Sequence, residues 1–173
     1  MGSLEQEFTE AFERYSDELF RHASMRLPNR ERAMELTQEC FMKVWQYAQN
    51  GHKVDAWRPF LYQTLRHLII DEYRRKKSVS LEGMMREEDE STESMLPPDE
   101  SNTLLAAMER LDGKQAIEML RDLPYIYSEV LTLRFVESMS PGEIAQVVGE
   151  SENVVSVRIH RGLKKLKEML EKQ

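Results

Sequence analysis

Two short helical patterns separated by one glycine, in residues 140–166, constrain the fold of this chain more than any other feature. Ser140 and Glu143 have the spacing of a capping box around a proline at the first helical position. Gly149 can adopt a left-handed turn at little steric cost, and Ser151 is a good cap for the helix that follows. Apolar residues then recur with helical spacing. The pattern predicts a helix-turn-helix, which places its second helix in the major groove of DNA.

The outward face of this second helix carries side chains suited to DNA contact. Its first two turns, which enter the groove deepest in such a motif, present Ser156, Val157, His160 and Arg161. A guanidinium can bind guanine through two hydrogen bonds, so Arg161 is the candidate base reader. Phosphate contacts are assigned to the basic residues around it, which are Arg158, Lys164 and Lys165. The competing interpretation is an amphipathic helix whose basic face is merely solvated.

The net charge of −7 is concentrated in the middle of the chain. Residues 1–80 carry a net charge of +1 and residues 113–173 a net charge of 0, whereas residues 81–112 carry −8. The acidity therefore belongs to the central segment, and the flanking segments keep local basic clusters. A negative total charge is thus compatible with binding to nucleic acid.

The acidic central segment also indicates where the domains divide. Its acidic run at residues 87–94 precedes two prolines, and such a composition cannot bury enough apolar surface to fold alone. We therefore expect two domains, at residues 1–78 and 104–173. A flexible acidic linker over residues 79–103 would join them.

Helical periodicity extends through both expected domains. It predicts a helix ending before Pro28, a second over about residues 30–48 and a third over about residues 55–77. Pro59 falls in the first turn of the third helix, where a missing amide costs little. A further helix over about residues 125–136 precedes the helix-turn-helix. The expected fold is all-α, with two small helical domains of which the C-terminal one is the helix-turn-helix.

The third helix combines basic and aromatic residues. It ends in a cluster suited to phosphate contact, made of Arg74, Arg75, Lys76 and Lys77. Upstream, four side chains share or border one face, namely Gln63, Arg66, His67 and Ile70. Aromatic residues, Trp57 among them, lie near basic groups, as in proteins that bind single strands. The competing interpretation places the aromatic rings in the core and leaves the basic end as a solvated turn, favoured by the helix dipole.

The second helix has an acidic stripe opposite its apolar face. The stripe consists of Glu35, Gln38 and Glu39, with Met42 at its edge. On its own, such a stripe is usually a solvated face. Cys40 is the only cysteine and lies among apolar residues, which predicts a plain buried thiol and no internal disulfide.

The sequence contains no arrangement typical of catalysis or cofactor binding. The four histidines lack cysteine or carboxylate partners at metal-ligand spacing, and no glycine-rich phosphate loop is present. The aliphatic run at residues 68–70 is too short to span a bilayer, and no signal-peptide pattern occurs at the N-terminus. We expect a cytoplasmic protein that is not an enzyme and needs no cofactor, no metal and no membrane insertion.

Taken together, these segments resemble the bacterial sigma factors of the extracytoplasmic-function (ECF) group of the sigma-70 family. Residues 36–45 resemble the family's polymerase-binding helix, and residues 60–75 its helix for the minus-ten promoter element. The domain for the minus-thirty-five element is matched by residues 122–124, 133–135, 140–145 and 155–166. The matches follow the family's order and spacing, which makes the set specific although no single motif is decisive.

The resemblance implies a factor that brings core RNA polymerase to promoter DNA, helps to melt it, and is restrained by an anti-sigma factor. It implies that Glu35, Gln38 and Glu39 face the basic coiled coil of the polymerase clamp. The loop at residues 50–57, which includes Lys53 and Trp57, would capture a base flipped from the non-template strand, at a cost of a few kcal/mol of stacking. The residues that would flank this pocket are Gln63, Arg66, His67 and Ile70.

The sequence departs from the family pattern at several positions and leaves an alternative open. His67 stands where the family often has asparagine, and Gln63 where it often has arginine, so the resemblance does not define the promoter sequence. The alternative is a sigma-like mimic that sequesters an anti-sigma factor without binding DNA. Such a mimic would have little reason to keep the basic cluster at residues 74–77 and the basic recognition face. A plain helix-turn-helix repressor would leave the first domain unexplained.

Overall fold

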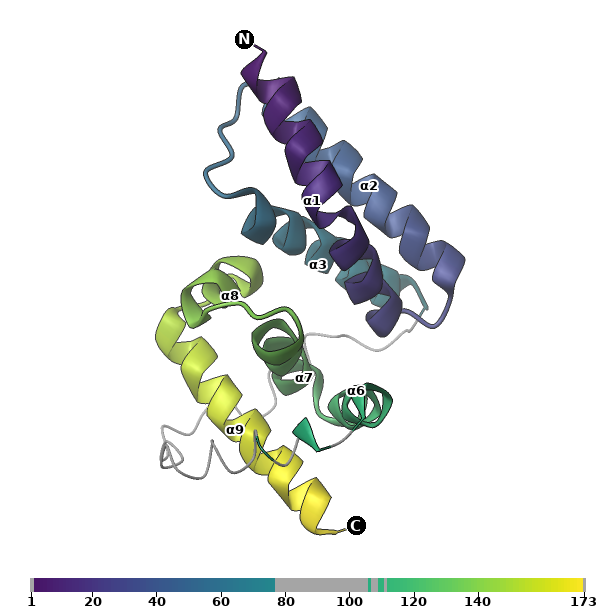
Figure 1. Ribbon diagram of the computed structural model, residues 1–173, viewed down its shortest axis with the longest axis vertical. Coiled ribbons are helices and arrows are strands. Elements are labelled where there is room, and N and C mark those ends of the chain that lie inside the picture. The colour runs from purple at the N-terminus through teal and green to yellow at the C-terminus, as the bar shows by residue number, and fades with distance from the viewer. Residues whose placement is uncertain (1, 77–105, 107–108, 111, 173) are drawn as a thin grey trace. The chain divides into compact units, whose positions relative to one another are not determined.

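The computed structural model describes residues 2–76, 106, 109–110 and 112–172, and Figure 1 shows these residues as an assembly of helices. Contacts divide the chain into two units, one with helices α1 to α3 and the other with α6, α7, η1, most of α8, and α9. The described part contains no strand, which confirms the expected all-α fold. The predicted linker lies outside the described residues, so its bounds and those of the two domains stay predictions. No helix in the described part is long and apolar enough to cross a membrane.

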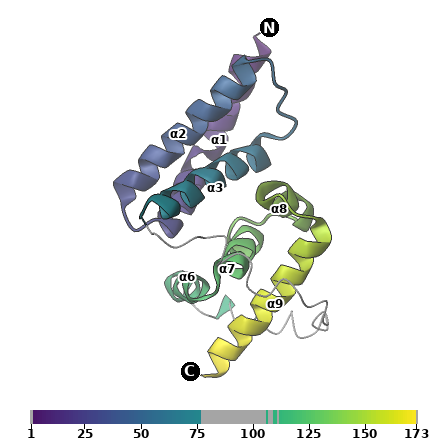
Figure 2. The ribbon, with the colours of Figure 1, turned by 180° about the vertical axis from the view of Figure 1, so that it is seen from behind.

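The first unit is a three-helix assembly. Helices α1 (Ser3–Arg26) and α2 (Arg30–Gln49) lie side by side and run in opposite directions, and α3 (Trp57–Lys76) crosses them (Figures 1 and 2). Asn29 caps α2 by accepting hydrogen bonds from the amides of Glu31 and Arg32. All three helices contribute to one apolar core, in which the large, fully buried side chains are Leu19, Leu36, Leu61, Tyr62, Leu65 and Ile69.

The edges of this core differ from the simple periodic pattern. Pro59 lies in the first turn of α3, as predicted. Tyr47 follows the buried Cys40 and Val44 at helical spacing, which places it on the inner side of α2, yet it is 39% exposed, and Phe12 on α1 is 47% exposed. Both rings lie at the margin of the helix contacts, where a helical stripe is wider than the neighbour that covers it. The exposed apolar groups make these margins candidate interaction surfaces.

The second unit contains α6 (Gly113–Asp122), α7 (Tyr125–Leu131), η1 (Thr132–Val136), α8 (Pro141–Val148) and α9 (Glu152–Glu171). The single helix predicted over residues 125–136 is in fact α7 followed by a π-helical turn, η1, in which the Glu137 amide donates to the Thr132 carbonyl. Helices α7 and α9 contact each other at Gly162, where an added Cβ would lie 3.0 Å from Leu131 Cδ1. Glycine therefore permits this close approach.

The predicted helix-turn-helix is formed by α8 and α9. The Glu143 amide donates to Ser140 Oγ and the Ser140 amide donates to Glu143 Oε1, so both halves of the capping box are made. Gly149 ends α8 with a φ of +73°, in the left-handed region that favours glycine. Ser151 then caps α9 by accepting from the Val154 amide. The two caps and the turn thus form at the residues where the sequence predicts them.

Candidate nucleic-acid and polymerase interfaces

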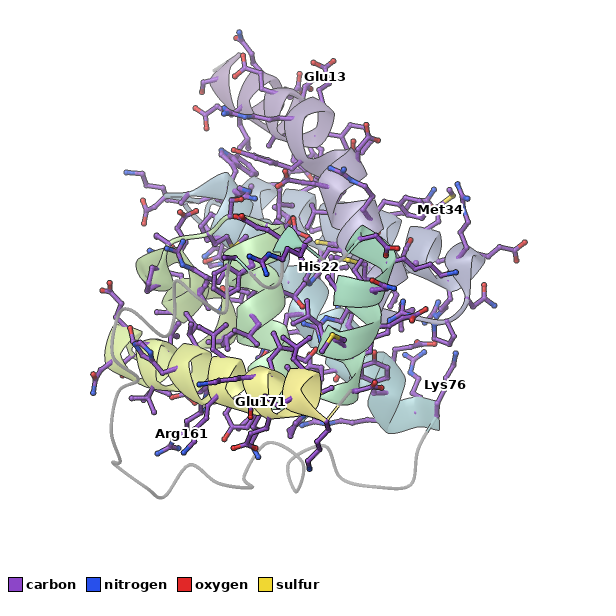
Figure 3. The ribbon with its side chains drawn as sticks, turned by 60° about the horizontal axis from the view of Figure 1, so that its bottom comes forward. Glu13, His22, Met34, Lys76, Arg161 and Glu171 are labelled. Carbon is purple, nitrogen blue, oxygen red and sulfur yellow. The ribbon has the colours of Figure 1, made fainter. Side chains whose placement is uncertain are left out.

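The outward side of α9 carries most of the residues predicted to contact DNA. Four of them are half-exposed in the first turns, namely Ser156, Val157, His160 and Arg161, and Lys164 is exposed. Arg161 projects from the helix in Figure 3. Lys165 leans back toward α7, with Nζ 5.6 Å from the ring centre of Tyr127. The structure thus brings polar and basic groups together on one side of the second helix.

Arg158 is the exception on this helix. It was expected on the outward face, but its side chain is only 7% exposed and the expected placement is wrong. Because it lies three residues after Val155 and four before Gly162, it shares the buried stripe of α9. Its Nη2 lies 3.5 Å from Oε1 of Glu150, in the turn between α8 and α9. Arg158 is therefore placed to hold the turn against the recognition helix rather than to reach a phosphate.

Helix α3 holds the second set of predicted DNA residues, and the structure separates them. His67 is exposed, and Gln63 and Arg66 are half-exposed. Ile70 lies four residues after Arg66 and three after His67, so it keeps to the side of α3 that they border, but it is buried, with 7% exposure, and is not open to a DNA contact. Helices α1 and α2 both pack against α3, whose other buried residues include Leu61, Leu65 and Ile69.

The basic cluster at the end of α3 is exposed. Arg74, Arg75 and Lys76 occupy the last turn and are exposed, and Figure 3 marks Lys76 at the helix end. Lys77 lies outside the described residues. The Nζ of Lys76, whose side chain is half-exposed, lies 3.7 Å from Oε1 of the buried Glu72. Three cations on one exposed turn can contact phosphates.

Glu72 makes an ion pair that the sequence did not reveal. It is buried in the last turns of α3, and its Oε2 lies 2.7 Å from Nη2 of Arg32 on α2. Arg32 also donates through Nη1 to Glu35, at 2.8 Å. The hydrogen bond from Arg32 lowers the pKa of Glu72 below its usual value of 4.5. The pair joins the start of α2 to the end of α3 across 40 residues of sequence, too far apart for any local pattern.

The loop between α2 and α3 presents aromatic and basic side chains. His52 is exposed and stacks on Tyr47, with ring centres 4.5 Å apart. Lys53 is exposed, with Nζ 3.7 Å from Oδ1 of Asp55. Trp57, predicted as a DNA residue, is half-buried, and its ring centre lies 6.1 Å from that of Phe8 on α1. Trp57 thus contributes to an aromatic cluster between helices, which is how the competing interpretation placed it.

The acidic stripe of α2 borders a cavity that the sequence did not predict. Glu35 and Gln38 are exposed and Glu39 is half-exposed. Beside Gln38, between α1 and α2, lies a cavity of about 480 Å³. Its lining is mostly apolar and consists of Glu5, Phe8, Thr9, Phe12, Gln38, Phe41, Met42 and Trp45. We call this cavity, with the acidic stripe beside it, the α1–α2 groove.

Exposed apolar residues continue this groove along α2. Met42 is 62% exposed and Met34 is 46% exposed, and Figure 3 shows Met34 projecting outward from α2. With Gln38 between them, these residues are spaced by four and follow one side of the helix. That spacing is the signal by which the sequence could have revealed the surface. An apolar strip with carboxylates beside it suits an amphipathic helix with basic residues.

The described residues were expected to hold neither a metal site nor a reactive thiol. No group of three or more His, Cys, Asp or Glu residues within them could hold a metal ion. The Sγ of Cys40 donates to the Leu61 carbonyl at 3.3 Å, and burial raises the pKa of this thiol to about 12. Cys40 is therefore an inert thiol near neutral pH.

Two family models match the chain in succession. The model of sigma-70 region 2 matches residues 11–79, and that of sigma-70 region 4 matches residues 113–166. The first match runs from within α1 past the end of α3, and the second runs from the start of α6 into α9. Together they span both proposed interfaces in α3 and α9.

Relatives in several bacteria match nearly the whole chain. The RNA polymerase sigma factor SigV of Bacillus subtilis is 25% identical over 159 residues, which cover 92% of this chain and 88% of that protein. The ECF RNA polymerase sigma factor BldN of Streptomyces coelicolor is also 25% identical, over 94% of this chain and 60% of that longer protein.

Solved structures of similar fold exist as complexes. CnrH with the cytosolic domain of CnrY has a TM-score of 0.68 at 19% identity, over 99% of this chain and 92% of that one. RpoE of Bartonella quintana, described as a sigma factor in complex with the anti-sigma factor NepR, has a TM-score of 0.67 at 19% identity, over 96% of this chain and 98% of that one. At this identity the likeness establishes the fold.

Proposed function

The chain belongs to the sigma-70 family as an RNA polymerase sigma factor of the ECF group, and we propose a separate role for each of its two units. The first unit docks on core polymerase and holds the melted strand, and the second reads the upstream promoter element in duplex form. One observation carries the proposal. Two separate helices, α3 and α9, each expose a basic surface, and each lies in its own matched region of the family.

The second unit reads the duplex through α9. Arg161 is the base reader, because it is long, basic and projects from the first half of the helix. Ser156, Val157 and His160 contribute to sequence choice beside it, and Lys164 and Lys165 contact phosphates. Arg158 is removed from this set because its side chain is buried against Glu150.

The first unit contacts the melted strand along α3 and the preceding loop. Arg74, Arg75 and Lys76 hold phosphates, and Lys77 next in sequence adds a fourth cation. Gln63, Arg66 and His67 flank the pocket for the flipped base, Lys53 lies in the loop that forms it, and His67 acts in melting rather than as the reader of that base. A base taken out of the stack costs a few kcal/mol, which these contacts must offset. Trp57 and Ile70 act indirectly, because packing against other helices already covers much of each side chain.

Core polymerase docks on the α1–α2 groove. The acidic stripe of Glu35, Gln38 and Glu39 complements the charge of a basic helix. The apolar strip with Phe12 and Met42 provides apolar surface that becomes buried when the helix docks. An anti-sigma factor is a further proposed partner, because the similar RpoE structure is described with one. The protein would act in the cytoplasm as a binding factor, without catalysis of its own.

Promoter-dependent transcription with purified core polymerase tests this function. We expect the chain to direct run-off transcripts from its host's genomic DNA, and core polymerase alone to direct none from the same start sites. The mimic would bind an anti-sigma factor and yield no such transcripts. A variant with Arg74, Arg75 and Lys76 all replaced by alanine should keep polymerase binding and lose initiation. Full initiation by that folded variant would contradict the role of α3.

A further inference from the structure

Two methionine side chains of α2 differ from the others in their exposure. Met42 is 62% exposed and Met34 is 46% exposed. The other methionines in the described part of the chain are half-buried or buried, and Met119 and Met139 lie in the core of the second unit. Met34 and Met42 follow one side of α2, and Met34 projects outward in Figure 3. We call these two residues the methionine pair.

The methionine pair presents thioether sulfur to solvent, whereas the thiol of this chain is withdrawn from it. Cys40, the only cysteine, is buried, and burial raises the pKa of its thiol to about 12. Such a thiol supplies almost none of the thiolate that reacts with peroxides. A thioether needs no deprotonation, so access to the sulfur governs its oxidation. Among the residues that the structure describes, the methionine pair therefore comprises the most exposed sulfur-containing side chains.

The methionine pair also lies on the surface proposed to dock core polymerase. Met42 lines the cavity of the α1–α2 groove together with Phe12 and Trp45, and Met34 continues the same side of α2 beyond Gln38. A helix that docks there covers Met42 in mostly apolar surroundings. A thioether suits such a site, because it is apolar and adapts its shape to a partner. A polar group at the same place would lose its hydrogen bonds to water on docking.

We propose that the methionine pair is a site of reversible oxidation, at which hydrogen peroxide or another two-electron oxidant weakens docking on core polymerase. The thioether sulfur attacks one oxygen of the peroxide, the O–O bond breaks, and the sulfur keeps that oxygen as a sulfoxide. The sulfur is oxidised by two electrons and the peroxide is reduced. The hydroxide that leaves takes the proton from the oxygen on sulfur and becomes water.

The effect on docking rests on the proposed function, because only a docked polymerase covers the sulfoxides. Oxidation converts a flexible apolar side chain into a polar one. Covering a polar group that finds no hydrogen-bond partner should weaken binding about 5- to 100-fold. Reductases that each act on one sulfoxide epimer return the thioether, so the change is reversible. The fold should be unaffected, because both side chains are exposed in the parent.

Peptide mapping by mass spectrometry tests the modification on the full, free chain. The protein is treated with a graded series of hydrogen peroxide and digested, and the gain of one oxygen is followed at each methionine. Among the described methionines, Met34 and Met42 should be oxidised first. Met119 and Met139 should stay reduced while the helicity is unchanged. Oxidation of these buried side chains before the methionine pair would contradict the proposal.

Binding to core polymerase tests the consequence, with each protein compared with itself before and after treatment. The peroxide is removed before the polymerase is added. The treated parent should bind about 5- to 100-fold more weakly, and both classes of methionine sulfoxide reductase together should restore its affinity. A double variant, Met34→Leu with Met42→Leu, keeps apolar side chains at these positions and every other methionine of the chain. Treatment should cause no further change in its affinity, whatever that affinity is beforehand.

Two controls separate this effect from general damage. Met169→Leu removes a half-buried methionine of α9 and should lose affinity on treatment as the parent does. The treated parent should also keep the helicity and the melting temperature of the untreated parent.

The outcomes distinguish the oxidation site from the proposed function. If the treated parent keeps its affinity although the methionine pair is oxidised, the oxidation site does not control docking. The same conclusion follows if the double leucine variant loses affinity as the parent does. In both cases, binding by the untreated parent still supports the proposed function. If the untreated parent does not bind core polymerase, the proposed function fails and control by oxidation fails with it.

Discussion

The two helices proposed to contact DNA, α3 and α9, are held in different ways. Helix α9 buries one stripe, which includes Val155, Leu163 and Leu166, and keeps Arg161 on the opposite side. Helix α3 packs against both α1 and α2, which bury a wide arc of its side chains. A helix covered on one side keeps a face broad enough for a duplex groove. A helix covered on two sides keeps a narrow strip, which suits a single strand.

The largest expected effect concerns the packing that fixes α9. Gly162→Leu should lower the free energy of unfolding by about 1–3 kcal/mol, because the new side chain meets Leu131 and Tyr127 at the α7–α9 contact. Gly113→Leu is the matched control, since a Cβ there meets no heavy atom within 4 Å in the described part of the chain. Urea unfolding of both variants measures the difference. Equal stability of Gly162→Leu and the parent would contradict the one-sided packing of α9.

Replacing Arg161 should weaken promoter binding, whereas replacing Arg158 should weaken the fold. Arg161→Ala should cost about 1–3 kcal/mol of promoter binding by the holoenzyme, relax specificity at one upstream base pair and leave the melting temperature unchanged. Arg158→Ala should instead lower the melting temperature, because it removes a buried side chain that pairs with Glu150. Binding measured on a set of single base-pair substitutions distinguishes them. A uniform loss for Arg161→Ala, with a shallower salt dependence, would make it a phosphate contact.

The ion pair that joins α2 to α3 should make the free energy of unfolding depend on pH. The hydrogen bond from Arg32 lowers the pKa of Glu72, so this pair stabilises the fold above the ordinary value of 4.5. The contribution is lost as the pH falls through the lowered pKa. Glu72→Gln should cost about 1–2 kcal/mol at pH 7 and progressively less as the pH falls below about 4. Thermal unfolding of both proteins between pH 7 and pH 3 measures it, and parallel curves would contradict the pair.

The smallest effect is expected at the acidic stripe. Reversing Glu35 and Glu39 together to lysine should weaken binding to core polymerase about 3- to 30-fold with unchanged helicity, because exposed charge pairs each contribute little. Reversing Glu168 and Glu171 changes the net charge equally in the second unit and should leave polymerase binding as it was. Normal affinity of the folded Glu35 and Glu39 variant would remove the acidic stripe from the interface.

The caps and the turn before α9 follow from neighbouring residues, whereas the burial of side chains on α3 depends on tertiary contacts. The cap at Ser140, the turn at Gly149 and the cap at Ser151 each need only neighbouring residues, so the sequence was enough to place them. The burial of Ile70 arises from tertiary packing, which periodicity along one helix does not record. Arg158 was wrongly expected on the outward face of α9 because it is charged, although its position borders the apolar stripe of that helix.

Contacts between distant segments account for what the sequence did not show at the sites. Arg32 and Glu72 are 40 residues apart in the sequence, and no local sequence pattern links them. The α1–α2 groove forms only when two helices meet, although the spacing of Met34 and Met42 was a visible clue. The ring of His52 meets that of Tyr47 only through a loop in which Gly51 takes a positive φ.

The division of labour between α9 and α3 is tested most directly by comparing duplex and pre-melted templates in one assay. Holoenzymes with Arg161→Ala and with His67→Ala are measured for open-complex formation on a linear duplex promoter and on the same promoter carrying a bubble. We predict that Arg161→Ala is impaired to the same extent on both, because its base pair stays in duplex form. His67→Ala should be impaired on the duplex and much less on the bubble. Equal impairment of His67→Ala on both templates, or its full activity on the duplex, would contradict the assignment of α3 to the melted strand.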